Sequence, residues 1–286
     1  MSSPEKFKFI DIHYHAAPDL YIRRRNAIEA GRLYHALHGA VVLKSHIGST
    51  GIQATIAQEM SLPVFPSVVL NHISGGINYK VVIHALSEYQ PLISGKMIVH
   101  FPTITGRKIQ SKLSRELTHD NLKQYTQQSE TLFGSKQQLR KEVIDILKMA
   151  RDYPIVLTSG HASKEEIYKL IDACNQYDVP SLLLSQPANP LTGLKFPELN
   201  ELVKNEWLWV EQTALTFILG HQDKQDFSQV LTHLPRVIYS SDLGQPSQMD
   251  IPEWLHFSKS IFHELDLSEK RKEELLLSNA STLLNL

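Results

Sequence analysis

The chain has one cysteine and no surplus of charge of either sign. Its 286 residues include 29 Lys and Arg, 30 Asp and Glu and a single Cys, and the formal net charge is -1 with histidine neutral. A lone cysteine excludes an internal disulfide framework and a zinc site built on several thiolates. We expect Cys174 to be a small buried hydrophobe on a helix. The balanced charge argues against nucleic acid as a partner, because phosphate binding usually needs a basic excess.

Long apolar runs are also absent. No stretch approaches the ~18 apolar residues of a membrane-spanning helix, so we expect no membrane partner. The N-terminal residues lack the apolar core of a signal peptide and lead directly into a strand pattern, which predicts a cytoplasmic protein. The one basic cluster, Arg23 to Arg25, is typical of a solvated face at a helix start. No domain linker or low-complexity segment interrupts the sequence.

Short apolar segments alternate with helical patterns along the chain. The predicted strands cover residues 8–12, 40–44, 64–70, 96–101, 155–159, 181–185, 207–212 and 236–240. Most are almost uniformly apolar, as parallel strands covered on both faces are. Helical patterns follow, and one of them begins with Ser163 and Glu166 in a capping box. Eight strand–helix units in this length predict a single α/β domain, a (β/α)8 TIM barrel over residues 1–286.

Two segments exceed the spacing of a minimal barrel. Residues 103–135 are polar and follow the fourth strand, which predicts an elaborated loop on the face where such barrels carry their active sites. We favour a lid, and the alternative is a surface excursion with a short helix that makes an oligomer contact. Residues 251–286 predict C-terminal helices packed on the barrel exterior.

Six of the 14 histidines lie where predicted strands end, and most of the others scatter over surface or packing positions. The first strand ends in His13 and His15, and others end near His46, His72, His100 and His161, while Asp242 follows the last strand. Residues at the carboxyl ends of barrel strands form the active site. The period of two along a strand turns His13 and His15 to the same side, and two imidazoles facing one volume suit zinc.

These residues also carry a resemblance to a known family. Segments 11–15, 159–163, 240–245 and 278–286 resemble the amidohydrolase superfamily of metal-dependent hydrolases on (β/α)8 barrels. Segments 42–50, 68–78, 101–107, 158–163 and 240–245 resemble an uncharacterised branch of it. The resemblance implies His13, His15, His161 and Asp242 as ligands of one divalent metal, most often Zn, with Mn, Fe or Ni as alternatives. It also implies that Asp242 accepts a proton from the water that attacks the substrate.

Two positions depart from the superfamily pattern. The fourth strand offers His100 where binuclear members have a carboxylated lysine or a glutamate, and Gln186 stands after the sixth strand where many have histidine. The departure at His100 argues against a second metal ion, and the departure at Gln186 removes one candidate ligand or catalytic group. Gln186 and His100 therefore count as metal or substrate contacts.

Lys44 is the second residue with an expected catalytic role, because a lysine at the end of an apolar strand needs a task or a partner. It can bind a substrate carboxylate, pair with Asp242 or Glu211, be carboxylated and bridge two metals, or be purely structural. His46 faces the same way as Lys44 and is a metal or substrate contact. His72 has the same expected role. Arg107 in the long loop is a candidate clamp for an anionic substrate.

The glycine pair at positions 75 and 76 precedes a helix. It allows two interpretations, a phosphate-binding loop or ordinary turn chemistry.

The resulting functional hypothesis is a metal-dependent hydrolase that cleaves an amide, lactone or related C–N or C–O bond in a small molecule. A metal-dependent decarboxylase on the same scaffold and a degenerate barrel that only binds a small molecule remain alternatives. Barrels of this kind are frequently homo-oligomers, which leaves a homo-oligomer open.

Overall fold

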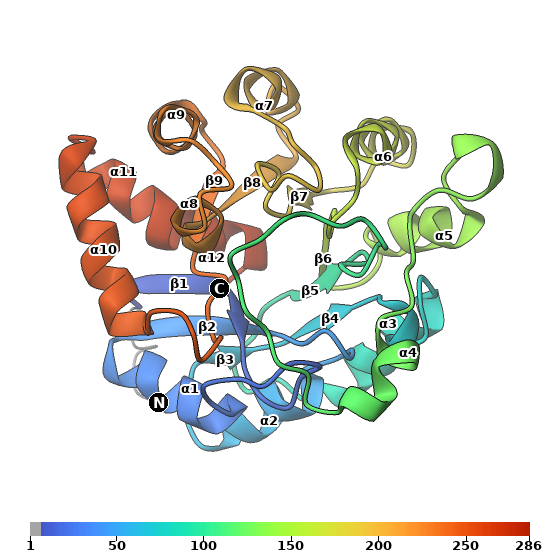
Figure 1. Ribbon diagram of the computed structural model, residues 1–286, viewed down its shortest axis with the longest axis horizontal. Helices are drawn as coiled ribbons and strands as arrows, with labels where there is room; N and C mark the ends of the chain where they lie inside the picture. Colours follow the sequence, from blue (N-terminus) through green and yellow to red (C-terminus); the bar gives the residue numbers. More distant parts are fainter. Residues whose placement is uncertain (1–6) are drawn as a thin grey trace.

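The computed structural model describes residues 7–286, so residues 1–6, at the start of the segment examined for a signal peptide, lie outside the described part. Strands occupy the centre and helices surround them (Figure 1). The strands are β1 (Phe9–His15), β2 (Gly39–Lys44), β3 (Val64–Phe65), β4 (Ser67–Val69), β5 (Met97–His100), β6 (Ile155–Thr158), β7 (Leu182–Leu184), β8 (Leu208–Thr213) and β9 (Val237–Ser240).

One main helix follows each barrel strand on the outside, where β3 and β4 together make one barrel strand. These helices are α1 (Ala27–Ala36), α2 (Gly51–Glu59), α3 (Tyr79–Glu88), α5 (Lys141–Met149), α6 (Lys164–Gln176), α7 (Phe196–Leu202), α9 (Lys224–His233) and α10 (Ile251–Glu264). The predicted capping box of Ser163 and Glu166 begins α6, and Cys174 is buried on the same helix. Burial raises the pKa of the Cys174 thiol to about 12, as expected for an inert apolar residue.

The strands pair in parallel in chain order, from β1 to β3 in one sheet and from β4 to β9 in a second. Pro66 divides the third barrel strand into β3 and β4, because proline has no N–H to donate to a neighbouring strand. The barrel closes between its first and last strands, where Asp242 N donates to His13 O at 2.9 Å and His15 N donates to Leu243 O at 2.9 Å. The predicted TIM barrel is confirmed.

The C-terminal helices do not all lie where the sequence pattern suggested. After α10, the chain forms α11 (Glu269–Glu273), a π-helical segment (Glu274–Ser278) and α12 (Asn279–Leu284). Buried residues of α12 cluster with one inward-facing layer from the barrel strands, namely Ile10, Ile12, Ala40, Val42, Phe65, Ile98, Val156, Leu183 and Ile238. The prediction of an exterior position is wrong for α12, whose Leu283 and Leu284 close the amino-terminal end of the barrel.

A bulge in β1 changes which side of the strand faces inward. Between the pairs Asp11–Val41 and Tyr14–Leu43, β1 contains one residue more than β2. Ile12 therefore faces the interior layer, while Tyr14 packs outward on Tyr34 of α1. An extra residue of this kind shifts the alternation by one position. The shift lets β1 supply apolar residues to the barrel interior and both histidines to the barrel mouth.

Residues 103–135 form an extended loop with two short helical turns, a 3-10 turn (Asp120–Leu122) and α4 (Lys123–Thr126). In Figure 1 this green segment crosses in front of the strand ends. Its middle is joined to the segment after β1, because Ile22 N donates to Glu116 O at 2.9 Å and Thr118 N donates to Leu20 O at 3.0 Å.

Within residues 7–286, no helix is both long enough and apolar enough to cross a membrane.

Candidate metal centre

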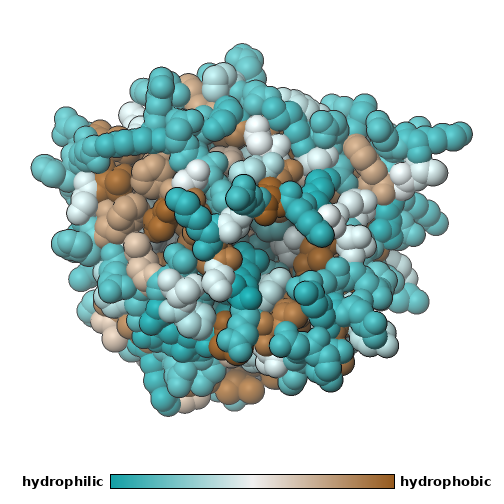
Figure 2. Space-filling model, in the orientation of Figure 1, coloured by the Kyte–Doolittle hydropathy of each residue, from teal (hydrophilic) through white to brown (hydrophobic). Residues whose placement is uncertain are grey.

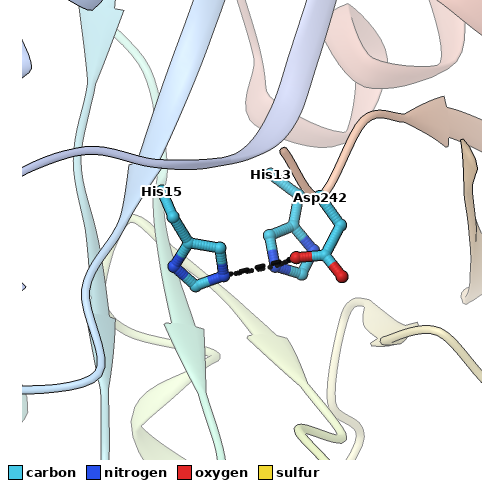
Figure 3. A group of neighbouring side chains, drawn as sticks. All are labelled: His13, His15 and Asp242. Carbon is cyan, nitrogen blue, oxygen red and sulfur yellow. Dashed lines mark hydrogen bonds and ion pairs between the residues drawn. The ribbon is translucent and has the colours of Figure 1, made fainter. Parts of the chain in front are cut away.

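Three side chains converge at the barrel mouth (Figure 3). The Nε2 atoms of His13 and His15 are 3.3 Å apart, and Asp242 Oδ1 lies 3.1 Å from the first and 3.3 Å from the second. All three residues are buried. Ligands at ~2.1 Å around a tetrahedral zinc ion are separated by ~3.4 Å, so these three atoms have the spacing of ligands to a single ion.

The orientation of His13 is set by a carboxylate that the sequence prediction did not assign to the site. Glu211 Oε1 lies 2.7 Å from His13 Nδ1, and Glu211 Oε2 accepts a hydrogen bond of 2.7 Å from Ser185. A carboxylate at Nδ1 fixes the imidazole tautomer and leaves Nε2 free to bind a metal. The sequence signal for this contact is a glutamate directly after an apolar run, and the sequence pattern indicates Glu211 only as a partner of Lys44.

Gln186 holds the other oxygen of Asp242. Its Nε2 donates to Asp242 Oδ2 at 2.5 Å, which leaves Oδ1 facing the two histidines. Both residues have positive φ, 46° for Gln186 and 55° for Asp242. Non-glycine residues in this region are uncommon and concentrate at functional sites. Gln186, which stands where many amidohydrolases have histidine, therefore orients Asp242.

The charges of the cluster shift its pKa values in opposite directions. Burial and Lys44 lower the pKa of His13, but Asp242 and Glu211 outweigh them and raise it to about 9. Burial raises the pKa of Asp242, yet His13 and His15 hold it well below its usual range. Burial, helped by the charge of Arg23, puts the pKa of His15 well below its ordinary value. His13 and Asp242 thus form a buried ion pair.

A second polar group adjoins the first on the side of His15. His46 stacks on His15 with ring centroids 4.7 Å apart, and its Nδ1 lies 3.1 Å from Asp19 Oδ2. Asp19 also pairs with the buried guanidinium of Arg23 at 2.5 Å. The nitrogen and oxygen atoms of His15, Asp19 and His46 lie close enough to hold an ion. The cation of Arg23, already seated on Asp19, disfavours a second metal there.

The expectation of a solvated arginine cluster is therefore wrong for Arg23. The residue precedes α1, and its side chain is fully buried against Asp19 because the loop after β1 folds back over the barrel mouth. Arg25 pairs with Asp250 at the surface, and Arg24 donates to backbone oxygens of residues 246 and 248. Only the pairing with Asp19, four residues earlier in the chain, carried a signal for the buried position.

Lys44 and His100 are also buried at the carboxyl ends of their strands, and His161, which is partly buried, follows the end of β6. Lys44 and His161 line the same cavity as the cluster. His100 Nδ1 lies 2.8 Å from Thr158 Oγ1, and its ring centroid is 6.2 Å from that of His13. Two buried ring nitrogens, His161 Nδ1 and His100 Nε2, lack a hydrogen-bond partner among the described residues. His161 does not join the three-atom cluster but supplies an unpaired donor atom beside it.

Two other predicted contact residues are engaged elsewhere. His72 is exposed and lines a separate cavity with Gly75 and Gly76. Arg107 lines the main cavity, but its guanidinium pairs with Glu166 at 2.9 Å and donates to His161 O at 2.6 Å. Arg107 thus links the long loop to α6 and to the segment that bears His161.

The cluster opens into a cavity of about 580 Å³. Residues 103–115 of the long loop form one wall, and an apolar wall is formed by Leu191, Leu215 and Leu219. Figure 2 shows this face, where hydrophobic residues lie among hydrophilic ones around a central depression. The volume is within the range of small-molecule sites, about 300–1,000 Å³.

The chemistry of the donor set fits a divalent metal. Two imidazole nitrogens and one carboxylate oxygen converge, and the second nitrogen of His13 is fixed by Glu211. His161, whose buried Nδ1 has no hydrogen-bond partner among the described residues, lines the same cavity. Nitrogen and oxygen ligands with such supporting hydrogen bonds are typical of zinc and related ions.

Known proteins were compared with the chain by sequence and by structure. A search of curated proteins finds no match. Similar solved structures include an amidohydrolase from Burkholderia multivorans with bound zinc, which is 12% identical with a TM-score of 0.55 over 96% of this chain and 98% of that one. An apo protein from Agrobacterium tumefaciens is 10% identical with a TM-score of 0.58, over 98% of this chain and 97% of the other.

An uncharacterised TIM-barrel protein from Bordetella bronchiseptica is 11% identical, with a TM-score of 0.57 over 96% of this chain and 97% of the other. These likenesses confirm, at the level of the fold, the resemblance noted in the sequence. A family model described as a family of unknown function, DUF6282, matches residues 8–211. The chain belongs to this family and has a TIM-barrel fold.

Proposed function

We propose that this protein is a metal-dependent hydrolase that cleaves an amide, lactone or related C–N or C–O bond in a small molecule. The observation that carries the proposal is the convergence of His13 Nε2, His15 Nε2 and Asp242 Oδ1 within hydrogen-bonding distance of one another in a cavity. The zinc bound by the Burkholderia amidohydrolase of similar fold supports zinc as the ion. His13, His15 and Asp242 would hold it, with His161 as a fourth ligand.

A divalent metal supplies two kinds of chemistry here, polarisation of a substrate carbonyl and a lowering of the pKa of water toward ~7. The residues of the chain supply the rest. Glu211 keeps His13 in the tautomer that binds metal, and Gln186 orients Asp242. Asp242 is ionised, because its pKa lies well below the usual range, and its carboxylate is the acceptor for the proton released by the attacking water.

Lys44 is a buried cation that lines the cavity, and this position suits a substrate-binding role. Burial lowers its pKa, while the negative charges of Glu211 and Asp242 raise it. In our proposal, Lys44 stabilises negative charge on the substrate. The residues 103–115 that line the cavity limit the access of bulk water during the reaction.

The test is elemental analysis of the full chain purified without chelator. We expect about one zinc or manganese ion per chain, lost in His13→Ala and retained in His72→Ala, whose histidine is exposed in another cavity. The wild type is then assayed against lactones, cyclic amides and amidines. A parallel assay uses carboxylic acids, and release of CO₂ from one of them would establish the decarboxylase alternative.

Two results would change the proposal. About two ions per chain would indicate a binuclear site and direct attention to a carboxylated Lys44. A wild type that stays metal-free after reconstitution would overturn the hydrolase and leave a barrel that binds a small molecule without turnover.

A further inference from the structure

The cavity above the cluster has an excess of positive side chains. Its lining includes the cations Lys44, Arg107, Lys108 and Arg115, and among the described residues that line it the only carboxylate is Asp242. Asp242 is already engaged by His13, His15 and Gln186. Of the arginines, Arg107 is neutralised by Glu166. The positive charge of Arg115 is therefore not matched by a protein carboxylate.

Arg115 is held in this position by the long loop. Its guanidinium carbon lies 5.2 Å from the centroid of the Tyr21 ring, and Tyr21 forms a bridge with Leu117. The backbone hydrogen bond from Ile22 N to Glu116 O fixes the adjoining residue. No carboxylate in residues 7–286 forms an ion pair with Arg115. Its side chain contacts the ring of Tyr21, which Arg23 also contacts.

Arg115 shares its aromatic neighbour, Tyr21, with a second arginine and a histidine. Arg23 lies over the same Tyr21 ring, 5.7 Å from its centroid, and His46 meets that ring edge-on at 5.3 Å. Arg23 is paired with Asp19, so Arg115 is the arginine at this ring that has no carboxylate partner among the described residues, and its charge attracts an anion that enters the cavity.

We propose that this protein acts on a small molecule that bears a carboxylate on an apolar body, and that Arg115 binds this carboxylate. Arg115 lies on the loop that walls the cavity, and the leucines at 191, 215 and 219 line the same cavity, so one ligand can contact both. A guanidinium matches a carboxylate with two parallel hydrogen bonds. This inference names the substrate class of the proposed hydrolase and rests on that proposal only for the reaction, not for the binding.

The experiment compares an acid with its neutral counterpart. Binding of 4-phenylbutyrate and of 4-phenylbutanamide to the full chain is measured by isothermal titration calorimetry, for the protein as purified and after treatment with chelator. We expect the acid to bind at least ~10-fold more tightly than the amide, as hydrogen bonds to charged groups predict. Arg115→Gln is expected to remove most of this preference in both preparations.

The matched control is Arg32→Gln, an exposed arginine on α1 outside the cavity, which is expected to keep the preference. An unchanged thermal midpoint and zinc content in Arg115→Gln separate lost recognition from lost structure. Equal binding of acid and amide, an unchanged preference in Arg115→Gln, or no binding of the acid at millimolar concentration would each overturn the proposal.

A preference that disappears with chelator alone would assign it to the metal and also contradict the role of Arg115. The hydrolase proposal fails on different evidence, namely a wild type without metal. Binding of the acid by metal-free protein, dependent on Arg115, would then still establish the anion site.

Discussion

Glu211 Oε1 lies 2.7 Å from Nδ1 of His13, and both side chains are almost completely buried. The other nitrogen of the same ring, Nε2, lies 3.1 Å from Asp242 Oδ1. One imidazole from β1 is thus held between a carboxylate of β8 and a carboxylate that follows β9. The contact with Glu211 explains how a histidine on the first strand is oriented by a residue 198 positions later.

Replacing Glu211 with glutamine tests this orientation. The amide no longer accepts a charge-assisted hydrogen bond from Nδ1–H, so we expect the affinity for zinc to fall by about 10–100-fold. The affinity is measured by competition with a chromophoric chelator. Glu206→Gln, at an exposed position just before β8, is the control and is expected to bind zinc as the wild type does. Wild-type affinity in Glu211→Gln would show that Glu211 does not support the metal.

Metal binding is expected to release a proton at neutral pH. Because the pKa of metal-free His13 is about 9, its ring is protonated at pH 7 and must become neutral to bind an ion. The low pKa of His15 adds no further proton. We expect release of about one proton per ion, and apparent affinity that falls by about tenfold per pH unit below the pKa of His13.

Calorimetric titration in two buffers of different ionisation enthalpy measures the protons released. A binding enthalpy that is the same in both buffers would contradict the protonated state of His13.

The buried pair of Arg23 and Asp19 predicts a large loss of stability on substitution. In Arg23→Gln a buried carboxylate loses its cation, and we expect the free energy of unfolding to fall by about 3–5 kcal/mol. Arg25→Gln breaks the half-exposed pair with Asp250 and is expected to cost about 1 kcal/mol or less. Urea denaturation of the two variants checks the difference. Equal losses would show that burial of the Asp19 pair adds nothing.

Gly244 permits the close approach that joins β1 to the segment after β9. Its φ is 113°, and a Cβ there would lie 1.9 Å from His15 O. We therefore expect Gly244→Ala to displace His15, with a loss of several kcal/mol in stability and of bound metal. Gly220 also has a positive φ, 73°, but a Cβ at this position would have no atom within 4 Å. The control Gly220→Ala is expected to cost only the conformational penalty of about 1–2 kcal/mol and to keep its metal content.

Circular dichroism melts and elemental analysis are the measurements for this pair. If both variants lose the same stability and keep their metal, the contact with His15 is not what requires glycine at position 244.

The sequence by itself determined the fold class and the strands that carry the candidate metal site. The alternation of apolar segments with helical patterns predicts a barrel because parallel strands must be covered on both faces. A barrel brings strand ends together, so histidines and an aspartate at those ends predict a site without any knowledge of distances. His13, His15 and Asp242 were found in this way.

The tertiary structure determines features that the hydrophobic periodicity of the sequence does not predict. The bulge in β1 changes the phase of its side chains, and strict alternation from Ile10 and Ile12 would turn His13 outward. The tertiary structure also determines which residues that are distant in the chain contact each other. Glu211 contacts His13, and Arg23 is buried against Asp19 under the loop that follows β1. Helix α12 closes the amino-terminal end of the barrel. Each of these depends on segments distant in the chain meeting in space, and local residue patterns do not encode that distance.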